Sequence, residues 1–293
     1  MPPLPPLRDM IRERMPDLTD AERRLAAVLT EDSMVNGLQS ITKLAEDAGV
    51  STPTIIRMAR KLGFDGFPTL QNAIREELAA RIKQPLAKLD QWGAGGADDH
   101  IINRFAQAAS ANINRTLDRL DLGSFDQAAD VLSNTDRHVH LLGGRITRSI
   151  ADYFFNHLQI IRPHVSLLAQ SPNIWPHHLL DMDATSVLVL FDIRRYEKEL
   201  ERLADLAAER KVEILLFTDQ WGSPIEKRAS VCFRTMVEAP SSWDSNLAIL
   251  FLVEALIAEV QSRSSRDSIT RIDSLERMLG QTRLFRSDTG GQD

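Results

Sequence analysis

Apolar residues recur at helical spacing along the first part of the chain, without runs of alternating β-branched residues. Thr19 and Glu22 stand three residues apart, the spacing of a capping box, which predicts that a helix begins at Thr19. Three more helices are expected, at about 38–47, 51–62 and 67–83. Residues 8 to about 83 are therefore predicted to be all-helical.

The pattern changes twice after that. A glycine-dense segment at 92–97 is typical of a linker, and helices are expected again at 99–120 and 124–133. From about residue 137, short apolar runs alternate with helical stretches. Strands are expected at 138–142, 165–169, 186–193, 212–218 and 231–236. Helices are expected up to 161, at 196–210, at 243–263 and after 265. The predicted fold class is an all-α domain followed by an α/β domain, with a parallel sheet between helices.

Composition narrows the possible functions. The chain has 293 residues, enough for two domains, and no apolar run approaches the roughly 18 residues of a membrane span. Its opening, Met1 to Leu7, lacks the basic start and long apolar run of a signal peptide. The single cysteine, Cys232, argues against a disulfide framework and a multi-cysteine zinc site. We therefore expect a cytoplasmic protein with no metal, no cofactor and no membrane partner.

The formal net charge of −6 argues against a protein that binds nucleic acid over its whole surface. The charge is unevenly distributed, however. Residues 8–83 contain twelve basic and twelve acidic residues, so the −6 resides in the remainder of the chain. Residues 51–62 contain three basic residues and no acidic one. This local charge of +3 is the electrostatic footprint that a DNA recognition helix needs.

Ala45, Gly49 and Ile55 have the spacing of a helix-turn-helix. A small residue at the first position lets two helices cross closely, and glycine at the second supplies the positive φ of the turn. The β-branched residue at the third position fills the crossing. Ser51 is expected to cap the second helix, with Pro53 in its first turn.

On a helical wheel the second helix has an apolar face and a basic face. The apolar face, assigned to the core, consists of Ile55, Met58, Ala59 and Leu62. The opposite face consists of Pro53, Thr54, Arg57, Arg60 and Lys61. Thr54 and Arg57 are predicted to contact base edges, since a guanidinium matches guanine in the major groove. Phosphate contacts are predicted for Ser51, Thr52, Arg60 and Lys61. The alternative is a helical hairpin with a solvated charged face, because this spacing alone also occurs by chance.

The motif Ser51-x-x-Thr54-x-x-Arg57, followed by Arg60-Lys61-Leu62-Gly63-Phe64-x-Gly66-Phe67, resembles the N-terminal domain of RpiR/MurR-type bacterial regulators. The resemblance covers about residues 8–83 and implies a helix-turn-helix that binds DNA. It also implies a following sugar isomerase (SIS) domain, a flavodoxin-like sandwich that usually senses a phosphosugar. The expected partners are a double-stranded DNA operator, a small anionic effector and further copies of the chain in a homodimer or homotetramer.

The domain boundaries expected from this resemblance and from the pattern are as follows. The DNA-binding domain occupies 1–83, a linker with a connecting or oligomerisation helix occupies 84–123, and the SIS domain occupies 124–280. Residues 281–293 are expected to be a disordered tail. Two copies are expected to pair through helix 243–263, which is apolar nearly all round, or through helix 99–120.

Two loops that follow predicted strands depart from the SIS pattern. The first usually reads Gly-x-Gly-x-Ser; here Gly143 and the hydroxyl of Thr147 are kept, but Arg145 replaces the second glycine. The second usually reads Ser-x-Ser-Gly-x-Thr. Its corresponding positions here are Asp192, Arg194, Arg195 and Glu197. Guanidinium groups have thus replaced a cradle of hydroxyls and amides.

The predicted effector site consists of Gly143, Gly144, Arg145, Thr147, Asp192, Arg194 and Arg195. In one interpretation the three arginines hold an anion through bidentate bonds, either a phosphate in a different pose or the carboxylate of a sugar acid. In the other, Asp192 and Glu197 neutralise the arginines, and the closed domain serves as a dimerisation scaffold.

The predicted function is a ligand-responsive transcriptional regulator and not an enzyme. Effector binding would change how two SIS domains pack, and thereby the spacing of two helix-turn-helix heads. One alternative is a sugar-phosphate isomerase, in which Asp192 or Glu197 would have to act as the general base. Another is a DNA-binding scaffold with a silent SIS domain.

Overall fold

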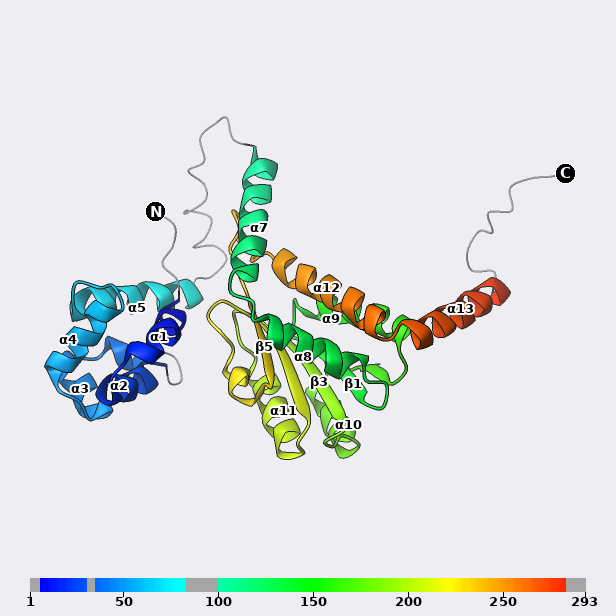
Figure 1. The fold of residues 1–293 in the computed structure, drawn as a ribbon, viewed down its shortest axis with the longest axis horizontal. Helices are drawn as coiled ribbons and strands as arrows, with labels where there is room; N and C mark the ends of the chain where they lie inside the picture. Colours follow the sequence, from blue (N-terminus) through cyan, green and yellow to red (C-terminus); the bar gives the residue numbers. More distant parts are fainter. Residues whose placement is uncertain (1–5, 31–34, 83–99, 283–293) are drawn as a thin grey trace. The chain divides into compact units, whose positions relative to one another are not determined.

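The computed structural model describes residues 6–30, 35–82 and 100–282, in two compact units that divide between Ala94 and Gly95 (Figure 1). The predicted linker at 92–97 and the tail after residue 282 lie outside the described residues. Among the residues described, no helix is long and apolar enough to cross a membrane.

The described part of the first unit is helical, as predicted. Its helices are α1 (Leu7–Arg14), α2 (Asp20–Thr30), α3 (Ile41–Ala48), α4 (Thr52–Lys61) and α5 (Phe67–Ile82), with 3-10 turns η1 (Met15–Asp17) and η2 (Val35–Leu38). Helix α4 packs against α2, α3 and α5. Its apolar residues Ile55, Met58 and Ala59 are fully buried, as the wheel predicts. Helix α1, which lies in the segment predicted to be helical but was not expected as a separate helix, contributes Leu7 and Ile11 to the same core.

Local hydrogen bonds set the helix boundaries of this unit. Glu22 accepts from the backbone N–H and the hydroxyl of Thr19 at 2.9 and 3.0 Å, which confirms the capping box at the start of α2. The Ser40 hydroxyl caps α3 by accepting from the Lys43 N–H at 3.2 Å. Helix α3 ends at Gly49, whose φ of 60° is the left-handed turn predicted there.

The second unit contains a five-stranded parallel sheet, as predicted. Its strands are β1 (His138–Gly143), β2 (Val165–Leu167), β3 (Ser186–Asp192), β4 (Glu213–Asp219) and β5 (Val231–Thr235), in the order β2-β1-β3-β4-β5. Strands β1, β3 and β4 are buried almost throughout, which explains why they read as continuous apolar runs.

Helices cover both faces of the sheet (Figure 1). On one face lie α8 (Leu122–Ser133), α9 (Arg148–Ile161) and α12 (Leu247–Arg263), which share a core with stacked Phe191 and Phe217. On the other face lie α10 (Trp175–Leu180), which the sequence does not reveal, and α11 (Lys198–Glu209). The short turns on this side are η3 (Pro172–Ile174) and η4 (Pro224–Arg228). Helix α7 (Ile101–Leu117) packs against α12 and β5, and α13 (Ser265–Thr282) packs mainly against α9.

The strand order reverses direction between β1 and β3, which are hydrogen-bonded neighbours although β2 lies between them in sequence. In open α/β sheets, ligands bind outside the carboxyl ends of the strands at such a switch point. The loops after β1 and β3 therefore meet at the edge where the sequence places the effector site.

Candidate functional site

Helix α4, the predicted recognition helix, starts at the predicted place but with a different arrangement of hydroxyls. Ser51 occupies the N-cap position, yet its hydroxyl bonds the Thr54 hydroxyl at 2.9 Å and makes no side-chain cap bond. The Arg57 guanidinium also donates to the Thr54 hydroxyl, at 3.2 Å. Thr54 is only 5% exposed, so its predicted place on the exposed face is wrong. It precedes the buried Met58 by one helical turn and so lies at the edge of the core-facing side, where its hydroxyl can orient Arg57.

The three basic residues of α4 differ in their surroundings. Arg57 and Arg60 are exposed, and the Arg60 Nε donates to the Asp65 carbonyl at 3.4 Å. Lys61 instead donates to the buried carboxylate of Glu22 at 2.7 Å and to the Asp17 carbonyl at 3.1 Å. Lys61 therefore attaches α4 to α2 and to the turn η1, and the two arginines remain as the outward-facing cations of α4. Thr52, at the first helical position, is partly exposed.

At the switch point, the first predicted effector loop is held tightly to the sheet. The Gly144 N–H and the Thr147 hydroxyl both donate to the Phe191 carbonyl, at 3.1 and 2.8 Å. A Cβ on Gly143 would come within 2.5 Å of the Thr147 carbonyl oxygen, so only glycine fits at that position. Gly143, Gly144 and Thr147 are all buried and shape the loop that leads into α9.

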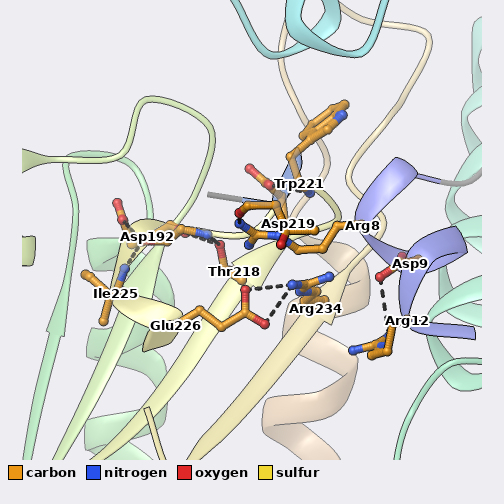
Figure 2. A network of polar contacts seen from close by, with 12 residues as sticks. Arg8, Asp9, Arg12, Asp192, Thr218, Asp219, Trp221, Ile225, Glu226 and Arg234 are labelled. Carbon is orange, nitrogen blue, oxygen red and sulfur yellow. Dashed lines mark hydrogen bonds and ion pairs between the residues drawn. The ribbon is translucent and has the colours of Figure 1, made fainter. Parts of the chain in front are cut away.

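Asp192, at the end of β3, is a buried acid whose carboxylate is hydrogen-bonded by neighbouring residues (Figure 2). Its carboxylate accepts from the Ser223 hydroxyl at 2.5 Å and from the Glu197 N–H at 3.2 Å. Burial raises the pKa of Asp192 to about 7, and the nearby carboxylates of Asp219 and Glu197 add to this, although the two hydrogen bonds oppose it. One interpretation of the sequence predicted that Asp192 neutralises an arginine. The structure contradicts this, because the hydrogen bonds of the carboxylate come from Ser223 and Glu197.

Asp219, at the end of the neighbouring strand β4, is fully buried and was not among the predicted site residues (Figure 2). It accepts from the Arg194 N–H at 2.6 Å, the Tyr196 hydroxyl at 2.7 Å and the Trp221 N–H at 3.0 Å. Burial raises its pKa, against the effect of these donors. The hydrogen bond from the Arg194 N–H to Asp219 accompanies a φ of 66° at Arg194. Residues other than glycine rarely adopt this backbone conformation.

The guanidinium of Arg194 is paired with Asp244, in the loop that precedes α12. The Nε and Nη2 atoms of Arg194 each donate to one oxygen of Asp244 at 2.7 Å. The same guanidinium lies 4.0 Å from the centre of the Trp221 ring. An arginine of this site is thus neutralised internally, but by Asp244 and not by Asp192 or Glu197. The Glu197 carboxylate accepts instead from the backbone N–H of Arg145, at 2.8 Å.

Arg145 and Arg195 complete the predicted set. Both side chains are exposed, and neither has an ion-pair partner within residues 6–30, 35–82 and 100–282. Sequence reasoning missed Asp219, Tyr196, Trp221 and Asp244. The rule that strand ends form the site could have found Asp219, but no local signal points to Asp244, which lies 50 residues after its partner.

A cavity of about 460 Å³ lies beside this network, within the usual range for small-molecule sites. Its polar wall contains Ser149, in the first turn of α9, and Asp244, Ser245 and Asn246, which precede α12. Its apolar lining consists of Phe105, Ile150, Tyr153, Leu247 and Leu250.

The described residues offer little for metal or thiol chemistry. No group of three His, Cys, Asp or Glu side chains in the described ranges could hold a metal ion. Burial raises the pKa of the Cys232 thiol to about 12, so this cysteine is not a thiolate nucleophile at neutral pH.

Both halves of the chain match known families. The helix-turn-helix domain of the rpiR family matches residues 7–81, and the SIS domain matches residues 132–259. The HTH-type transcriptional regulator HexR of Pseudomonas aeruginosa is 25% identical, over 94% of this chain and 96% of the relative. HexR of Escherichia coli is 23% identical, over 90% and 92%.

Solved structures share the fold. The sugar isomerase domain of an RpiR transcription factor from Sphaerobacter thermophilus has a TM-score of 0.58 at 18% identity, and covers 61% of this chain and 99% of that one. The Vibrio vulnificus NanR protein complexed with ManNAc-6P has a TM-score of 0.55 at 17% identity, and covers 95% and 100%.

Proposed function

We propose that this chain, which belongs to the RpiR-type family of helix-turn-helix transcriptional regulators with an SIS domain, binds a double-stranded DNA operator through α4 and senses an anionic sugar metabolite. One observation carries the DNA-binding half. Helix α4 follows a left-handed glycine turn and has two outward arginines, with no acidic residue between 51 and 62. This is the arrangement with which a helix-turn-helix reads the major groove.

Arg57 is the residue we assign to base recognition. Its guanidinium is exposed and is steadied by the Thr54 hydroxyl, which orders the side chain before DNA is bound. We assign Arg60 to a phosphate, together with Ser51 and Thr52 at the start of the helix. Lys61 contributes to the field of the helix while it remains bonded to Glu22.

For the sensing half of the proposal, we assign an anionic sugar metabolite to the carboxyl edge of the sheet. Arg145 and Arg195 supply exposed positive charge there, and the adjacent cavity has room for a sugar. The shared fold of the NanR complex with ManNAc-6P supports a phosphosugar, and a sugar acid is the second candidate. The acids Asp192 and Asp219 are occupied by protein donors, which supports a regulator over an isomerase.

We further propose that the protein acts as a homodimer or homotetramer, since one recognition helix alone gives modest affinity. Three exposed apolar residues support a contact through this helix: Trp243 before α12, Leu247 at its first position and Phe251 in its second turn. Light scattering coupled to size exclusion tests this; a monomer at micromolar concentration would contradict it.

The test of DNA binding is selection of bound sequences from a random pool, followed by affinity measurements on the selected DNA. Arg57→Ala should weaken binding by about 1–3 kcal/mol and relax the preference at one base pair. The matched control is Arg75→Ala, an exposed arginine on α5. Equal affinities for Arg57→Ala, the control and the unaltered protein would overturn the role of α4.

The test of sensing repeats these measurements with a panel of sugar phosphates and sugar acids. We expect at least one of them to change operator affinity. If none does, the sensing half is wrong and the scaffold interpretation replaces it.

A further inference from the structure

The loop that precedes α12 supplies an anion to Arg194 from within the same chain. The two bonds to Asp244 have the bidentate geometry with which arginine also holds ligand carboxylates and phosphates. Both side chains are largely buried, at 12% and 17% exposure. The guanidinium that the sequence offers to an effector is therefore already occupied.

Arg194 is held in place by contacts that do not depend on Asp244. Its N–H is bound by Asp219, and its guanidinium is within 4.0 Å of the Trp221 ring centre. Trp221 is itself 4% exposed and bonded to Asp219. Without the Asp244 carboxylate, these two contacts would still hold the Arg194 backbone and the face of its guanidinium, and such preorganisation favours anion binding.

Asp244 belongs both to the ion pair with Arg194 and to the lining of the cavity. The residue lines the cavity of about 460 Å³, together with Ser149 and Asn246, whereas Arg194 is not among the lining residues. A ligand bound in the cavity would therefore lie next to the residue that pairs with Arg194.

We propose that Asp244 is a built-in competitor that an anionic effector must displace from Arg194. Displacement would release the loop that precedes α12 from the loop after β3, and so convert ligand binding into movement at the start of α12. This inference rests on the proposed sensing function of the SIS domain. It adds Asp244 as a residue that controls both which anion binds Arg194 and whether the loop before α12 is released.

The competition favours doubly charged ligands. A tethered carboxylate acts at a high effective concentration, so a free monocarboxylate of equal charge cannot replace it. A phosphate near pH 7 carries a charge of about −1.5 to −2 and offers three acceptor oxygens, so it can. Asp244 thus makes the Arg194 site select phosphate over carboxylate.

Tryptophan fluorescence of the full chain tests this directly, because Trp221 senses the position of the Arg194 guanidinium. Inorganic phosphate should change the emission, acetate at equal ionic strength should not, and Trp221→Phe should remove the phosphate response. In Asp244→Asn, phosphate should bind about tenfold more tightly or better, and acetate should produce a response. The matched control is Asp205→Asn, which breaks an exposed Asp–Arg pair elsewhere in the same unit and should behave like the unaltered protein.

Equal phosphate affinity in Asp244→Asn, Asp205→Asn and the unaltered protein would overturn the proposal. So would undiminished phosphate binding after Arg194→Gln. If circular dichroism shows that Asp244→Asn is not folded, the phosphate and acetate titrations of the unaltered protein decide, and equal responses to both would contradict a competitor at Arg194. None of these titrations involves DNA. The competitor role of Asp244 can therefore fail while operator binding and effector response hold in the DNA assays, and the reverse outcome can be recognised as well.

Discussion

Arg162 shows how a single residue can join several elements of the second unit. It is fully buried at the end of α9 and donates to the backbone carbonyls of Leu132, Arg137 and Pro163. These carbonyls belong to the last turn of α8 and to the segments that precede β1 and β2. Burial, and to a smaller extent the charge of Arg137, lowers the pKa of Arg162 to about 10, so the side chain stays charged at neutral pH.

Arg162→Met should therefore destabilise the second unit by about 3 kcal/mol or more. The change keeps the apolar stem but leaves buried carbonyls without donors, each of which costs about 1–3 kcal/mol. Urea unfolding followed by tryptophan fluorescence measures the effect. Arg202→Met, at an exposed position on α11, is the control and should stay within about 0.5 kcal/mol. Similar losses for the two variants would contradict a structural role of Arg162.

The acid Asp192 should make stability depend on pH in an unusual direction. Its pKa is about 7 in the folded protein against a usual value of 3.8, so between these values the folded state binds more protons than the unfolded state. The folded protein should therefore lose stability through this residue as pH rises from about 4 to 7. His140 opposes this trend. Burial lowers the pKa of His140 from 6.5 to about 4, so in this pH range the unfolded state binds more protons. The contribution of His140 to the stability of the folded protein is therefore lost as pH falls from about 6.5 to 4.

Asp192→Asn isolates the first contribution, because asparagine is neutral at every pH and keeps groups that can bond Ser223 and Glu197. The free energy of unfolding of the variant, minus that of the unaltered protein, should increase between pH 4.5 and 7.5. At about 1.4 kcal/mol for each pH unit, the increase is at most about 4 kcal/mol. In Asp183→Asn no such gain is expected, because bonds from Thr185 hold the pKa of this exposed acid below its usual value. A difference that stays constant with pH would contradict a protonated Asp192.

At the scale of elements, a buried carboxylate holds the recognition helix to the rest of its domain. Glu22 caps α2 through Thr19 and also binds Lys61 at the end of α4, with a side chain only 3% exposed. Burial alone would raise the pKa of Glu22. The hydrogen bonds from Lys61 and Thr19 outweigh this and leave the pKa below its usual value.

Glu22→Gln should destabilise the first unit by about 1–2 kcal/mol, since the neutral amide keeps the shape of the side chain but loses the charge that faces Lys61. Thermal unfolding followed by circular dichroism detects the change. The matched control, Glu46→Gln, disrupts only the exposed pair with Lys43 and should cost less than about 0.5 kcal/mol. An unchanged transition in Glu22→Gln would show that α4 does not depend on this ion pair.

The elements that could be predicted are those whose signals are local. The capping box at Thr19, the glycine turn at Gly49 and the apolar strands each depend on a few neighbouring residues, and the structure confirms them. Helices α1 and α10 have eight and six residues and are held by packing on distant elements, which a local pattern does not show. Thr54 was misplaced because it lies at the border between the two faces of the helix, one turn before the buried Met58. The pairing of Arg194 with Asp244 depends on two separate loops and is invisible to any local pattern.

At the scale of the whole molecule, the net negative charge lies outside the domain proposed to bind DNA. The −6 of the chain resides outside residues 8–83, so the protein as a whole does not attract DNA strongly. If α4 binds the operator as proposed, its few cations limit the number of phosphate contacts and hence the dependence of binding on salt. Each phosphate contact contributes about −0.9 to the slope of log affinity against log salt concentration. The slope therefore counts contacts and can count subunits as well.

Arg60→Ala provides this count. If Arg60 binds one phosphate in each recognition helix, a dimer on its operator loses two contacts and the slope should become less negative by about 1.8, whereas a single bound chain would show about 0.9. Arg75→Ala should leave the slope unchanged. Fluorescence anisotropy with the selected DNA, from about 50 to 200 mM salt, is sufficient for the measurement. An unchanged slope for Arg60→Ala would mean that Arg60 does not contact phosphate, and a change near 0.9 would refute paired recognition helices even if the protein is dimeric in the absence of DNA.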